Sequence, residues 1–181
     1  MLFENDLTGS FMLSLPLLDG HPFYEMSVLY IYEHNQDGVK ALVVNKPVEN
    51  SLQQIIKSIF PHSNVVTIND APVLMGGPNN EDYIYVLSYD EQSKQYTVST
   101  SRKLLLDIAE GNGPIISHIF SGMCQWTNAR FFSEFRRNYW ILAKPSVSSM
   151  MKTPMESRYQ MVMESLGILD AYPLMGICAE A

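Results

Sequence analysis

Two runs of strand-forming residues around a short polar stretch constrain the fold of this 181-residue chain more than any other feature. Ser27–Glu33 and Val39–Asn45 are rich in Val, Leu, Ile and Tyr, and the sequence HNQDG separates them. An Asp-Gly pair favours a turn with positive φ, so the runs are predicted to form a β-hairpin with a loop of about five residues. Lys46-Pro47 ends the second strand, because proline has no donor for the ladder.

Other short apolar runs predict further strands. They are Ser10–Leu15, Tyr83–Tyr89, Gln95–Ser99 and Ile115–Phe120. The second and third of these runs are separated only by DEQSK, which indicates a second hairpin.

Helices are predicted from apolar stripes next to capping residues. One follows Asn50 or Ser51, one follows Ser101, and one lies within NARFFSEFRRNYW. A fourth follows Thr153, where Pro154 and Glu156 complete an N-terminal signal. Hairpins joined to isolated helices indicate an α+β fold. We expect one domain over residues 1–181, with a mixed, mostly antiparallel, curved or barrel-like sheet flanked by about four helices.

Charge and composition exclude several classes of protein. Nineteen Asp and Glu against twelve Lys and Arg give a net charge of −7, which disfavours direct nucleic-acid binding. Arg130, Arg136 and Arg137 are interleaved with aromatic residues, as in single-strand binders. The helical spacing of the aromatics instead favours an amphipathic helix that leaves Arg136 and Arg137 on its solvated face. The chain has no apolar run of the roughly 20 residues that a membrane helix needs. MLFENDLTGS lacks the basic start of a secretory signal, so we expect a cytoplasmic protein without membrane contact.

The order of several spaced motifs resembles a known family. LPLLDGHPFYEMSVLYIYEHNQDGVKALVVNKP precedes MGGP, then SRKLLLDIAEGNGP, then a Trp-bearing segment before an amphipathic helix. This order is similar to the YqgE/AlgH family of bacterial proteins, from about Gly9 to the C-terminal GICAEA. The resemblance implies an α+β fold with a barrel-like sheet. It implies no reaction, because the family has no established biochemical activity, although one branch carries a transcriptional-regulator label.

Single residues carry the resemblance, and a few depart from it. The matching residues are Glu33, His34, Gly38, Asn45, Pro47, Gly76, Gly77 and Pro78. Lys46 stands where the family usually has arginine, and Ala41 where it usually has glycine. SGMCQWTNARF replaces a segment rich in glycine and tyrosine. Lysine lacks the planar fork of arginine, so any shared anion site would be weaker in this chain.

Turn geometry explains Gly38, Pro47 and the Gly-Gly-Pro motif but not the polar residues beside them. We therefore predict a ligand-binding surface whose candidate residues are Glu33, His34, Asn45, Lys46, Gly76 and Gly77. The expected function is that of a non-enzymatic regulatory or binding module whose partner is a protein or a small-molecule ligand. The sequence carries no signal for an oligomeric state.

Two other classes of function stay open. In an enzyme, His34 would act as acid or base with Glu33 or Asn45 as its orienting partner, because histidine titrates near neutrality. A transcriptional regulator, acting on DNA directly or indirectly, follows only from the family label.

Metal, cofactor and nucleophile signals are weak. Glu33, His34 and Asp37 crowd one loop, but closed metal sites use three or four ligands and no second histidine lies nearby, so we predict no metal. Cys124 and His118 could form a nucleophile and base, although a buried, inert cysteine is the simpler interpretation. The chain has no G-x-S-x-G, P-loop or G-x-G-x-x-G motif, and no cofactor is expected.

Overall fold

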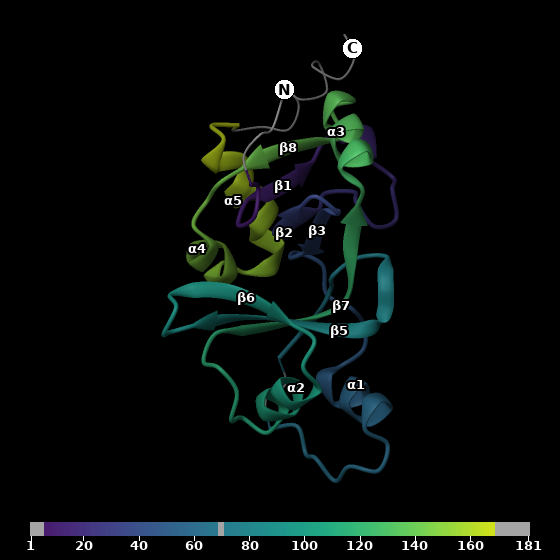
Figure 1. The fold of residues 1–181 in the computed structure, drawn as a ribbon, viewed down its shortest axis with the longest axis vertical. Coiled ribbons are helices and arrows are strands. Elements are labelled where there is room, and N and C mark those ends of the chain that lie inside the picture. Colours follow the sequence, from purple (N-terminus) through teal and green to yellow (C-terminus); the bar gives the residue numbers. More distant parts are fainter. Residues whose placement is uncertain (1–5, 69–70, 169–181) are drawn as a thin grey trace. The chain divides into compact units, whose positions relative to one another are not determined.

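A computed structural model describes residues 6–68 and 71–168 of the chain, which Figure 1 draws as a ribbon. The predicted family segment GICAEA and Cys178 lie outside the described residues. The chain divides into two compact units: unit 1 comprises Met1–Lys46 and Cys124–Ala181, and unit 2 comprises Pro47–Met123. Strand β7 (Ser117–Trp126) passes from unit 2 into unit 1.

Unit 1 contains an antiparallel sheet in the order β7–β3–β2–β1–β8. Its strands are β1 (Phe11–Ser14), β2 (Val28–Asn35), β3 (Gly38–Val43), the end of β7, and β8 (Trp140–Ala143). All four residues of β1 are buried, so both of its faces are covered. The predicted β2–β3 hairpin is present and is the central pair of this sheet.

The hairpin turn is tighter than the sequence predicted. Asn35 pairs with Gly38, which leaves two residues in the turn in place of about five. A Cβ atom on Gly38 would lie 2.1 Å from the carbonyl oxygen of Trp126 on β7. Glycine is therefore required here by the close approach of a third strand, which the local turn pattern could not reveal.

The helices of unit 1 are α3 (Asn128–Arg136), α4 (Val147–Lys152) and α5 (Arg158–Ser165), with short 3₁₀ turns at Pro16–Leu18 and Met155–Ser157. The predicted cap at Thr153 is wrong. Its hydroxyl donates back to the Ser149 carbonyl of α4, and Pro154 begins a 3₁₀ turn before α5. Thr153 is instead the C-cap of α4, a helix that the sequence did not predict.

Unit 2 contains β6 (Gln95–Ser99), β5 (Asn79–Asp90) and β7 in antiparallel order, and β4 (Val73–Met75) pairs with β7 in parallel. Helices α1 (Leu52–Ile59) and α2 (Arg102–Ala109) lie next to each other beside these strands (Figure 1). Their apolar faces meet β4, β5 and β7 in one core, which comprises Leu52, Ile56, Val73, Val86, Leu105, Ile108, Ala109 and Ile119.

The first half of β5 bulges away from β7. Asn79 pairs with Met123 and Ile84 with Ser121, so four residues of β5 face the single residue Gly122. Asn80 has a positive φ of 52°, and Gly122 has a φ of 71°. Bulges of this kind bend a strand and re-aim its side chains, and they are common next to functional sites.

The α+β class and the mixed, mostly antiparallel sheet are confirmed, with β4–β7 as the parallel pair. The described residues form five α-helices, of which only α4 is shorter than eight residues. Three elements, β4, β8 and α4, were not predicted. SGMCQW, within the segment that departs from the family pattern, is part of β7. Within the described residues, no helix has the length and apolar character that a bilayer crossing needs.

Candidate functional site

Glu33 and His34 lie on β2 near the hairpin turn, and each already has a partner. A register shift between Ile31 and Glu33 brings Glu33 opposite Lys40, whose ammonium lies 2.9 Å from its carboxylate. His34 Nδ1 accepts a hydrogen bond from the Leu7 backbone at 3.1 Å. The His34 ring also lies against two phenylalanines of α3. Both side chains therefore stabilise the end of the hairpin.

Asn45 and Lys46 follow β3, at the other end of the hairpin from Glu33 and His34. The Asn45 side chain accepts from the Val28 amide and donates to the Met26 carbonyl, both at 2.8 Å. Lys46 Nζ donates to the Phe23 carbonyl at 3.0 Å, and partial burial lowers the pKa of its ammonium. Both residues fix the chain that enters β2. The four predicted polar residues therefore form two separate pairs.

Gly76 and Gly77 belong to unit 2, where they support the β5 bulge. The Gly76 amide donates to the Ser121 carbonyl at 2.8 Å. A Cβ atom on Gly122 would lie 2.3 Å from the Gly77 carbonyl oxygen, so the Gly-Gly-Pro segment and β7 approach each other closely. The predicted glycines thus have a structural role beside the cavity described next.

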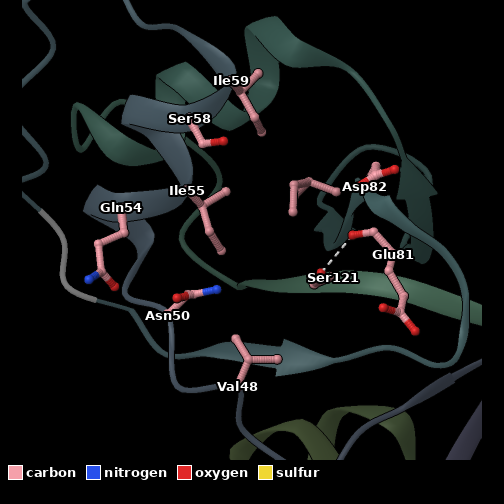
Figure 2. A pocket seen from close by; sticks show the side chains of 10 residues that line it. Val48, Asn50, Gln54, Ile55, Ser58, Ile59, Glu81, Asp82 and Ser121 are labelled. Atoms are coloured by element: carbon pink, nitrogen blue, oxygen red, sulfur yellow. Dashed lines mark hydrogen bonds between the residues drawn. The ribbon is translucent and has the colours of Figure 1, made fainter.

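A cavity of about 450 Å³ lies between α1 and the β5 bulge (Figure 2). Helix α1 provides one wall, with the side chains of Ile55, Ser58 and Ile59 facing across the opening. The bulge provides the opposite wall through Glu81 and Asp82. The remaining lining residues are Val48, Asn50, Gln54, Ile84 and Ser121. We call this cavity the α1–β5 groove.

Local hydrogen bonds hold both walls of the groove. Ser51 and Gln54 form a reciprocal capping box that starts α1. Ser121 Oγ donates to the Glu81 carbonyl at 2.9 Å, which pins the bulge to β7. Leu52 and Ile56 on the buried side of α1 anchor the helix in the core of unit 2.

The groove has an acidic rim and an apolar wall. The carboxylates of Glu81 and Asp82 form no ion pair or hydrogen bond with any described residue. None of the residues that line the groove is basic. Two unpaired carboxylates beside isoleucine side chains suit a ligand that combines a cationic donor with an apolar chain.

Sequence reasoning missed the groove because its lining residues are common polar and apolar types that form no motif. The signal that could have found it is NNED after the Gly-Gly-Pro turn. Two adjacent acids interrupt the start of a strand there, while α1 presents Gln54 and Ser58 one turn apart.

Cys124 and the residues considered as metal ligands offer no second site. Cys124 is buried in β7, and burial raises the pKa of its thiol to about 12, which leaves it protonated and inert. Across the part of the chain that the structure describes, no three His, Cys, Asp or Glu side chains gather as metal ligands.

Comparison with known proteins identifies the class. A family model described as AlgH-like matches residues 11–170, and the chain therefore belongs to the AlgH-like family. It is 30% identical to the UPF0301 protein YqgE of Escherichia fergusonii, covering 97% of this chain and all of that protein. A UPF0301 protein of Coxiella burnetii is 27% identical, and the alignment covers 93% of each chain.

Solved structures agree with the family assignment. The solution structure of the AlgH protein from Pseudomonas aeruginosa is similar to this chain with a TM-score of 0.79 and 25% identity. The similarity covers 97% of this chain and 96% of that protein. A protein of Corynebacterium diphtheriae shares the fold alone, with a TM-score of 0.56 and 14% identity.

Proposed function

We propose that this protein is a non-enzymatic binding module that holds a ligand bearing an ammonium or guanidinium group in the α1–β5 groove. The observation that carries the proposal is the pair of carboxylates, Glu81 and Asp82, that have no partner among the described residues while they line a cavity. A cation in the groove would supply the missing charge-assisted hydrogen bonds.

The apolar wall supports the same class of ligand. Ile55, Ile59 and Ile84 are half-buried around the opening and would cover a short alkyl chain. Each buried methylene contributes about 0.8 kcal/mol, so a few of them add affinity that exposed ion pairs alone do not provide. The fixed bulge and capped helix hold both walls in place before the ligand arrives, which lowers the entropic cost of binding.

Three small molecules of the same size test the charge preference. Butylammonium, butanol and butyrate should be titrated separately into ¹⁵N-labelled protein, with amide chemical shifts as the readout. We expect butylammonium to shift the amides of residues 50–59 and 79–84 at millimolar concentration, and to bind more tightly than butanol. Added salt should weaken this binding, because the rim carboxylates are exposed. Equal shifts with butylammonium and butanol would reject a charge-selective groove.

A double variant tests the residues. Glu81→Gln with Asp82→Asn should weaken butylammonium binding about tenfold, since each exposed ion pair is worth up to about 1 kcal/mol. The matched control is Glu91→Gln with Glu110→Gln, which removes the same charge from two exposed positions of unit 2 that do not line the groove. If both double variants bind equally well, the proposed site is wrong.

A further inference from the structure

A second cavity adjoins the α1–β5 groove on the side of α2. Its volume is about 450 Å³, and it shares Ile59, Asp82 and Ile84 with the groove. The other lining residues are Tyr83, Thr100, Ser101, Arg102 and Leu105. Because three side chains line both cavities, a ligand that extends past them enters both. We call the second cavity the Arg102 pocket.

The charge of the Arg102 pocket differs from that of the groove. Arg102 is the one basic residue among those lining either cavity, and its guanidinium has no ion pair or hydrogen bond with another described residue. The hydroxyl of Thr100 beside it is likewise without a partner in the described chain. A guanidinium offers two parallel donors that match a carboxylate, and a nearby hydroxyl can add a third.

Local structure holds this end of the pocket. Ser101 Oγ accepts a hydrogen bond from the Leu104 amide, and the Ser101 amide donates to Ser99 Oγ at 3.1 Å. Leu105, which also lines the pocket, is buried in the core of unit 2. The backbone that carries Thr100 and Arg102 is therefore anchored on both sides, and Tyr83, which also lines the pocket, is 61% exposed.

We propose that the ligand of these joined cavities is dipolar: an amine and a carboxylate separated by an apolar spacer. The cationic end lies at Glu81 and Asp82, the spacer crosses Ile59 and Ile84, and the carboxylate pairs with Arg102. This inference rests on the proposed function, because it adds a second anchor to the same site. Free ω-amino acids and peptides with a lysine near a free C-terminus both carry this chemistry.

The first test compares each ω-amino acid with the alkylammonium of the same chain length, using chemical shifts to measure Kd. In the wild type, one amino acid of the series should bind about fivefold more tightly than its alkylammonium, the gain of one added ion pair. Arg102→Gln should abolish that gain, so that the amino acid binds no more tightly than its alkylammonium. The matched control is Lys103→Gln, which removes the same charge from the adjacent exposed residue outside the pocket.

The outcomes separate this inference from the function on which it depends. The dipolar ligand is wrong, and the cation site stays in place, if alkylammonium ions bind while no amino acid binds more tightly than its alkylammonium. The same conclusion follows if the Arg102 and Lys103 variants lose the added affinity of the amino acid equally. If alkylammonium ions fail to bind, the proposed function fails first. A peptide ending in Lys-Ala, with a free or an amidated C-terminus, distinguishes a peptide ligand from a free ω-amino acid. A peptide ligand requires the peptide with the free C-terminus to bind more tightly than its amide and more tightly than every ω-amino acid.

Discussion

At the scale of single residues, Arg158 is the most unusual side chain in the described structure. It is only 3% exposed, yet its guanidinium donates to three backbone carbonyls, those of Val44, Met151 and Thr153, and to no carboxylate. A buried cation is tolerated when its donors are hydrogen-bonded. The guanidinium therefore connects the start of α5 with the end of α4 and the residue after β3.

Arg158→Met should lower the free energy of unfolding by about 3 kcal/mol, because the three carbonyls lose their donor. Urea denaturation measures the change. Arg136→Met is the control, since Arg136 is exposed on α3 and its replacement should cost no more than about 0.5 kcal/mol. Similar costs for both variants would contradict the structural role of Arg158.

Cys124 is expected to react slowly in the folded protein. Burial raises the pKa of its thiol to about 12, while an unfolded cysteine titrates near 8.5. Because only the thiolate is nucleophilic, the folded protein at pH 8 should react with a disulfide reagent at least about a thousandfold more slowly than free cysteine. The measurement uses a Cys178→Ser background, with full reactivity expected in concentrated guanidinium chloride. Fast labelling of the folded protein would contradict a buried thiol.

The raised pKa of Cys124 also predicts how the free energy of unfolding depends on pH. A folded pKa above the unfolded value means that the native state keeps its proton, so this stabilisation is complete below about pH 8.5 and is lost as pH rises to about 12. The difference between a pKa of about 8.5 and one of about 12 corresponds to roughly 5 kcal/mol. The free energy of unfolding of Cys124→Ala should therefore fall less steeply across this range than that of the wild type. Parallel slopes would show that Cys124 is not the titrating group.

At the scale of elements, the β5 bulge depends on a glycine in the opposite strand. Gly122 and Gly111 both have positive φ, 71° and 79°, but only Gly122 faces backbone atoms within contact distance. Gly111→Ala should cost about 1 kcal/mol from backbone conformation alone. Gly122→Ala adds a collision with Gly77 and should cost at least about 2 kcal/mol more, because two backbone segments must move apart.

The two alanine variants should also differ in binding. Gly122→Ala should displace the bulge and abolish butylammonium binding, whereas Gly111→Ala should leave the Kd unchanged. Thermal unfolding measures the stability of each variant, and the butylammonium titration measures its Kd. If Gly122→Ala binds as well as the wild type, the bulge does not position Glu81 and Asp82.

At the scale of the whole molecule, the net charge of −7 disfavours binding to nucleic-acid phosphates. A protein whose affinity came from phosphate contacts would need a compensating basic surface, and Arg130, one of the three interleaved arginines, is already paired with Glu134. We expect no mobility shift of duplex DNA even at about 50 mM salt. A shift that weakens steeply with added salt would contradict this and favour direct DNA binding.

The sequence anticipated more of the fold than of the site. The β2–β3 hairpin, the β5–β6 hairpin and a helix start at Asn50 or Ser51 were predicted because residues close in sequence determine them, and the structure places the cap at Ser51. The role of Asn45 was missed because its partners, Met26 and Val28, lie far back in the chain. Asn45 has no partner close to it in sequence, so its side chain was interpreted as functional. In the fold it forms hydrogen bonds with the backbone of Val28 and Met26.

The sequence by itself therefore determined the α+β class, the hairpins, four of the five α-helices among the described residues, and the family. These properties follow from periodicity, turn residues and motif order, which are local. Only the tertiary structure decided which polar residues are already paired and which are free. That difference arises because Glu33, His34, Asn45 and Lys46 meet their partners only when the chain folds. Glu81, Asp82 and Arg102 become prominent only in three dimensions, because they line cavities and have no partner among the described residues.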